Sequence, residues 1–193
     1  MRRMYWSGLL MSSLLSAVLF SGVAQAFSGN WTFSGHWGHG DLDYTTDSGE
    51  FLYSDINDSS SMFGVSAHYR LMNNLGVRAM YERGDYHSRT YCSPGDDVIC
   101  TPINREDNTR FESWSLALVP RLRVAPMWSV YGTLGIADMR HASGEFFTGQ
   151  SETAVIYGGG LRANFLPRTH VSLEYEMSDF DYSVARLSLG VRF

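Results

Sequence analysis

The sequence predicts an all-β fold, an eight-stranded antiparallel up-and-down transmembrane β-barrel, and three observations predict it. Apolar and polar side chains alternate over eight segments, and no segment has a convincing period of 3.6 residues. Short turns alternate with long polar connections. The last segment, residues 183–193, alternates without a break and ends on Phe193. Because successive side chains of a strand point to opposite faces, each segment has one apolar face and one polar face.

The first 26 residues are expected to be a secretory signal peptide. Two arginines precede an apolar run over residues 9–23, and residues 24–26, Ala-Gln-Ala, supply a small-residue cleavage site. Serines interrupt the apolar run, which argues against a retained anchor. We therefore expect a signal peptide over residues 1–26 and one barrel domain over residues 27–193.

The eight strands follow from the period-two pattern. They are expected over residues 30–44, 60–71, from 75 onward, 111–124, 128–140, 153–165, 170–177 and 183–193. Their apolar faces hold, in chain order, Trp31, Phe33 and Trp37; Phe63, Val65 and Tyr69; Val77, Ala79 and Tyr81; Trp114, Leu116 and Leu118; Val130, Leu134 and Ile136; Val155, Tyr157 and Leu161; Val171, Leu173 and Tyr175; and Leu187, Leu189 and Val191. Asp138 interrupts the fifth apolar face, so we expect a bulge or a position above the lipid there.

The connections indicate how the barrel is oriented. The expected turns cover residues 72–74, 125–126 and 167–169, and the expected long loops cover residues 45–59, 88–108 and 142–152. Barrels of bacterial outer membranes have short turns on the periplasmic rim and long loops outside the cell. The last hairpin, around Asp179, is short although it falls on the long-loop side.

The number of large apolar side chains decides which face points inward. A soluble lipocalin-like barrel would hold its apolar face inside. The interior of eight strands is only just wide enough for ordinary side chains or one small ligand, so Trp31, Trp114 and Phe165 do not all fit there with their neighbours. We therefore expect the apolar face to contact lipid, with aromatic girdles near both interfaces. The short-turn girdle would hold Trp31, Trp128, Phe165 and Phe193, and the loop-side girdle Phe111, Trp114 and Tyr81.

The opposite face is rich in small residues and in charges of both signs. Ion pairing offsets the cost of burying such charges. The expected interior ion network comprises Arg70, Arg78, Glu82, Arg121, Arg123, Arg162, Glu174, Glu176, Arg186 and Arg192.

Three motifs together resemble the small OmpA-like and OmpX/Ail-like outer-membrane barrels. They are Tyr-Gly-Gly-Gly-Leu at 157–161, Val-Ser-Leu-Glu-Tyr-Glu at 171–176 and the ending Leu-Gly-Val-Arg-Phe at 189–193. The resemblance implies an integral outer-membrane protein whose activity resides in its loops. It implies that Phe193 is the signal for the outer-membrane assembly machinery, and that membrane lipid and lipopolysaccharide surround the barrel. A host or surface ligand bound through the loops is the further partner expected.

Charge and cysteine content exclude some functions. The chain contains no Lys, and without the signal peptide 13 Arg face 20 acidic residues, a net charge of −7. This balance disfavours nucleic acid as a partner. Because the chain is expected to be exported, Cys92 and Cys100 are expected to form a disulfide. No cofactor is expected.

Sequence alone leaves several functions open. We expect adhesion, host interaction or envelope integrity, without catalysis. The alternatives are a small anion-preferring pore, because Arg is in excess inside, and an enzyme acting on lipid A or phospholipid. The latter rests on His170, Ser172 and Glu174, which superficially resemble the His-x-Ser element of lipid A deacylases. His36 and His68 make a poor metal site without a carboxylate or thiolate at suitable spacing.

Overall fold

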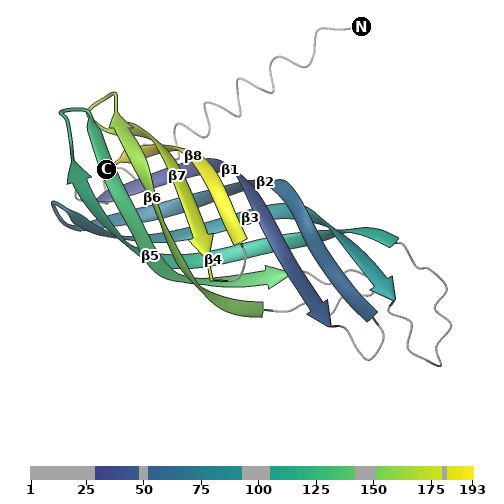
Figure 1. The fold of residues 1–193 in the computed structure, drawn as a ribbon. Coiled ribbons are helices and arrows are strands. Elements are labelled where there is room, and N and C mark those ends of the chain that lie inside the picture. The colour runs from purple at the N-terminus through teal and green to yellow at the C-terminus, as the bar shows by residue number, and fades with distance from the viewer. Residues whose placement is uncertain (1–28, 48–51, 93–104, 142–150, 180–181) are drawn as a thin grey trace, which may run out of the picture.

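The computed structural model describes residues 29–47, 52–92, 105–141, 151–179 and 182–193 (Figure 1). Within these ranges, side chains are described outside residues 44–57, 88–109 and 141–150. The signal peptide predicted over residues 1–26 lies outside the described residues, as does the side chain of each cysteine. No helix in the described part of the chain is long and apolar enough to cross a membrane.

Eight strands form the whole of the described structure. They are β1 (Trp31–Asp47), β2 (Leu52–Met72), β3 (Leu75–Cys92), β4 (Arg105–Arg123), β5 (Trp128–His141), β6 (Ser151–Asn164), β7 (Thr169–Ser178) and β8 (Tyr182–Arg192). Each strand pairs antiparallel with the next, and β8 pairs with β1 to close the barrel. The predicted fold class is confirmed.

The start of β1 and the end of β8 meet where the barrel closes. The backbone N–H of Phe193 donates to the carbonyl of Trp31 at 2.9 Å, and the Phe193 ring packs edge-on against Phe33 with centroids 5.8 Å apart. Trp31 and Phe193 lie at the end of the barrel that carries the short turns, as Figure 1 shows for the C-terminus. By the rule for outer-membrane barrels, this end is periplasmic.

Several strands are longer than the sequence predicts. At the ends of the strands far from the short turns, Asp47 pairs with Tyr53, Leu52 with Cys92 and Thr90 with Arg105. Strands include residues 45–47 and 52–59 of the first predicted loop, and residues 88–92 and 105–108 of the second, so the loop prediction is wrong for these residues. Residues 48–51 and 93–104 lie outside the described part of the chain. In Figure 1, β1 to β4 extend well past the β7–β8 hairpin on this side.

Asp58 stabilises an irregularity in the long β2–β3 pair. The register shifts between Asp55 and Met62. The Asp58 carboxylate accepts the backbone N–H of Ser59 and that of His87, both at 2.9 Å. Asp58, which lies in the predicted loop over residues 45–59, thus accepts backbone N–H groups beside the register shift.

Asp138 lies on the outer face without a bulge. The pairing of β5 with both neighbours keeps a constant register through this residue. Its carboxylate accepts hydrogen bonds from Arg140 at 2.9 Å and from Ser151 at 2.6 Å. Of the two explanations offered by the sequence, the bulge is wrong, and polar partners near the loop side surround the carboxylate instead.

The two faces of the sheet divide as the alternation predicts. Leu189 is 59% exposed and Trp114 57%, whereas Arg186 is 2% and Glu176 1% exposed. The outer face is thus a band of large apolar side chains, and the charged groups lie inside. In water this arrangement would leave an unusually large apolar surface uncovered, so it requires a lipid surrounding.

Candidate functional site

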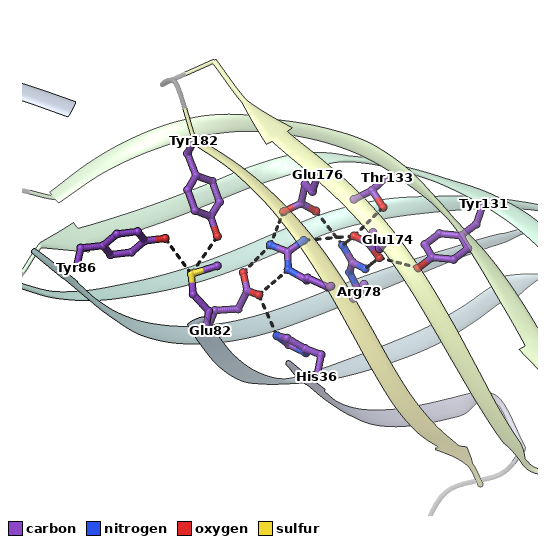
Figure 2. Close-up of polar contacts among 11 residues, drawn as sticks. His36, Arg78, Glu82, Tyr86, Tyr131, Thr133, Glu174, Glu176 and Tyr182 are labelled. Carbon is purple, nitrogen blue, oxygen red and sulfur yellow. Dashed lines mark hydrogen bonds and ion pairs between the residues drawn. The ribbon is translucent and has the colours of Figure 1, made fainter. Parts of the chain in front are cut away.

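The middle of the lumen holds a network of five buried charged residues (Figure 2). Arg78 and Glu82 come from β3, Glu174 and Glu176 from β7, and Arg186 from β8. Strands β3 and β7 lie opposite each other around an eight-stranded barrel. The network therefore crosses the lumen from wall to wall.

Arg186 joins all three carboxylates. Its Nε and Nη2 atoms each lie 2.5 Å from an oxygen of Glu82, in a bidentate pair. Nη2 also lies 2.9 Å from Glu176, and Nη1 lies 3.4 Å from Glu174. A fixed guanidinium fork suits this multiple recognition better than the single ammonium of a lysine would.

Arg78 forms the second cationic centre. Its Nη1 lies 2.5 Å from Glu174 Oε2, and its Nη2 lies 2.7 Å from Glu174 Oε1 and 3.0 Å from Glu176 Oε2. The Tyr131 hydroxyl donates to Glu174 at 2.8 Å. Each carboxylate therefore has several donors, which is the condition under which a buried charge is tolerated.

His36 extends the network to β1. Its Nε2 lies 3.0 Å from Glu82 Oε1. The imidazole reaches this position because Gly64, its partner on β2, has no side chain. A Cβ added to Gly64 would lie 2.3 Å from His36 Nε2 and 2.2 Å from the Tyr81 carbonyl oxygen.

Gly64→Ala is expected to lower the free energy of unfolding by about 1–3 kcal/mol, the usual cost of overpacking a core. Urea titration in lipid vesicles, followed by tryptophan fluorescence, measures the change. Gly35→Ala is the matched control, because a Cβ there meets nothing within 4 Å. Equal effects of the two substitutions would show that Gly64 does not make room for His36.

Above the network, toward the long loops, the lumen is filled by apolar side chains. Met62 and Phe111 are fully buried, and the hydroxyls of Tyr86 and Tyr182 point to the Met62 sulfur at 3.3 and 3.4 Å (Figure 2). The cluster is completed by Leu42, Ala117, Ala137, Met139, Ala154, Ile156 and Val184. The prediction that Phe111 belongs to an outer girdle is wrong. Phe111 lies two residues before the inward-facing Ser113 on the same strand, and this spacing is the sequence signal that places it inside.

The other predicted network residues lie elsewhere. Arg70, Arg121, Arg123, Arg162 and Arg192 lie toward the short-turn end of the strands. Among the described contacts, none of them forms an ion pair with a carboxylate. Arg70 instead donates to Asn30 Oδ1 at 2.9 Å, and Arg192 donates to the Pro167 carbonyl at 2.9 Å. The predicted ten-residue network is thus five residues at the centre and a separate group of arginines at the periplasmic end.

The layers of the lumen bear on the alternative functions. A wall-to-wall ion network beneath an apolar layer favours a plugged barrel over a conducting pore. Glu174 is occupied by Arg78, Arg186 and Tyr131, and the described contacts include no hydrogen bond between His170 and Ser172. This geometry does not resemble a nucleophile held by its base. Within the described residues, no three His, Cys, Asp or Glu side chains gather as a metal site.

Several solved structures similar to this chain are barrels of bacterial outer membranes. OprG of Pseudomonas aeruginosa aligns with a TM-score of 0.68 at 11% identity, over 86% of this chain and 96% of that one. The N-terminal barrel domain of P. aeruginosa OprF aligns with a TM-score of 0.56 at 16% identity, over 86% and 98% of the two chains. Ail of Yersinia pestis, crystallised with the heparin analogue sucrose octasulfate, has a TM-score of 0.50 at 21% identity, over 86% and 100%. These likenesses concern the fold.

The family assignment comes from the sequence comparison. No curated protein matches the chain. The model of the outer membrane protein beta-barrel domain, however, matches residues 12–193, nearly the whole chain. The chain therefore belongs to the outer membrane protein beta-barrel family and is a protein of the outer membrane.

Proposed function

We propose that this protein is a non-catalytic adhesion protein, which binds a positively charged surface or partner through its extended acidic hairpins. The observation that carries the proposal is the continuation of β1–β2 and β3–β4 past the level of the β7–β8 hairpin. Paired strands hold a binding segment at less entropic cost than an unstructured loop does. Envelope integrity, the other role open to this family of folds, would not require these extensions.

The charge of the first hairpin supports a cationic partner. Residues 41–59 hold six acidic residues and no Arg or Lys. Asp41 and Asp43 are exposed on β1, and Asp85 is exposed on β3, which lies on the other side of β2. Ail was crystallised with a polyanion; a polyanion would be repelled by this hairpin. Complementary charge raises association rates and suppresses wrong partners, so we expect selectivity for basic surfaces.

Other expectations belong to this proposal. The protein is exported by a signal peptide cleaved after residue 26, and Phe193 directs the last strand to the assembly machinery. Lipopolysaccharide surrounds the outer half of the barrel. A disulfide between Cys92 and Cys100 closes the connection between β3 and β4. Together these expectations place the hairpins on the cell surface.

Shortening each hairpin separately tests the role of the extensions. Joining Thr45 to Asp55, or Ser88 to Asp107, through Asn-Gly keeps the register, because the joined residues are already paired. We expect cells with the first variant to lose most of their binding to polycation-coated beads. A second variant, D43N/D47N/E50Q/D55N, should lose the same binding at full hairpin length. It leaves Asp58 intact because Asp58 stabilises the backbone.

Two controls distinguish a loss of binding from misfolding: the amount of protein at the cell surface and the salt dependence of binding. Variants must reach wild-type surface levels, and binding by the wild type should weaken as salt rises, since exposed charges are screened within about 10 Å at 0.1 M. Stronger binding to dextran sulfate beads than to polycation beads would contradict the proposed partner. Wild-type binding by both shortened variants would contradict the role of the hairpins.

A further inference from the structure

The periplasmic third of the lumen carries positive charge without a carboxylate to balance it. The buried carboxylates among the described residues are Glu82, Glu174 and Glu176. The three Glu are all bound by Arg78 and Arg186 in the central network. Arg70, Arg121 and Arg162 remain, and none has an ion pair among the described contacts. Their charge is therefore uncompensated by the protein on this side of the network.

Arg162 is the most buried of the three. It is 9% exposed, and its guanidinium lies over the Tyr131 ring at 5.4 Å from the centroid. Its Nε has no hydrogen-bond partner in the protein, and neither does Nε2 of the buried His68. Buried polar groups in folded proteins are nearly always satisfied by protein, ordered water or an ion. An unbalanced buried cation is the more costly case and favours a counter-ion.

The same residues line a cavity. A space of about 10 Å³ lies between β2, β4, β6 and the β2–β3 turn, and its apolar lining residues are Met72, Leu75 and Val119. Its polar lining residues are His68, Arg70, Asn73, Arg121 and Arg162. This volume suits one water-sized particle. A monatomic anion needs the least room of the anions that could balance Arg162, so we take a halide as the expected occupant.

The half-buried Arg70 and Arg121 line the periplasmic side of the cavity. Arg70 is fixed by its hydrogen bond to Asn30, and Arg121 Nη2 donates to the Asn73 carbonyl at 3.3 Å. Gly76 leaves room for the His68 ring, since a Cβ there would lie 2.1 Å from His68 Nε2. The cationic side chains are thus positioned by the fold around an open volume. On the opposite side, the central ion network closes the lumen.

We propose that this cavity is a halide site that binds a single chloride ion from the periplasm between Arg162, Arg121 and Arg70. The ion neutralises the buried guanidinium and does not pass through the barrel. It is a structural ligand of the barrel and is independent of the binding proposed for the hairpins.

Unfolding at constant ionic strength tests the site. In lipid vesicles, replacing gluconate by chloride should lower the unfolding equilibrium constant of the wild type, about 100-fold at a chloride concentration 100 times the dissociation constant. Gluconate keeps the ionic strength, and so the screening, equal. It is too large to occupy the cavity. R162Q and R121Q should each lose most of this chloride dependence. R168Q, which removes an exposed arginine from the β6–β7 turn, should retain it.

Bromide gives a direct measurement that does not depend on any variant folding. Crystals grown in bromide should show an anomalous peak in the cavity beside Arg162. A wild type equally stable in chloride and gluconate, or a cavity without bromide in such crystals, would overturn the proposal and assign the space to water. Retained chloride dependence in both R162Q and R121Q would overturn it as well.

Discussion

Arg186→Met is expected to lower the free energy of unfolding by about 3–5 kcal/mol, the largest effect of any single substitution considered for this protein. Arg186 is 2% exposed and contacts Glu82, Glu174 and Glu176. Its removal leaves Glu82 with His36 as its remaining described partner, in a part of the lumen closed to bulk water. Urea titration in vesicles measures the loss. Ser188→Ala, two residues along the same inner face, is the control and should change stability little.

A double variant distinguishes a lost ion pair from lost packing. Glu82→Gln keeps the size of the side chain and removes the charge left unpaired by Arg186→Met. We therefore expect R186M/E82Q to be more stable than the sum of its single variants predicts, by about 1–3 kcal/mol of coupling. Additive effects of the two substitutions would mean that the Arg186–Glu82 pair does not act as a unit.

Leu189→Arg is expected to cost about 2–4 kcal/mol, the cost of placing arginine on the lipid face near the bilayer midplane. Leu189 is 59% exposed and lies opposite Gly35 on β1, within the apolar band. The cost should fall for Arg placed near either interface, because the side chain then reaches the headgroups. The same titration in vesicles gives the value. If Ser188→Ala were the more damaging of these neighbouring substitutions, the assignment of faces would be reversed.

The alternation of side chains predicted the barrel well because a sheet with a lipid face has to obey it. A one-residue shift would expose Arg186 to lipid and bury Leu187, so the pattern fixes both register and face. Strand ends were predicted less well. Residues 52–59 carry polar side chains on both faces of the strand. Above the membrane no lipid requires alternation, so a paired strand there resembles a loop in sequence.

The lumen could be predicted in its composition and less in its arrangement. Sequence indicates that Arg78 and Glu174 both face inward, but their contact depends on how far each strand is shifted along its neighbours around the barrel. The same limit applies to Arg162. Its position in the alternation showed that it faces inward, but the sequence did not show that it has no carboxylate partner among the described contacts. The apolar layer was missed because Met62, within the predicted strand over residues 60–71, was not assigned to the inner face that its parity with Gly64 indicates. Phe111 was assigned by its aromatic character instead of its parity.

Contacts between acyl chains and protein methyl groups test the central claim most directly. In nanodiscs with a methyl-labelled protein, nuclear Overhauser effects from lipid acyl protons should reach the methyl groups of Leu187 and Leu189. They should be absent from Ala117 and Val184, which are 3% and 1% exposed inside the lumen. Acyl-chain contacts to Ala117 and Val184, with none to Leu187 and Leu189, would contradict a barrel whose apolar face is outside.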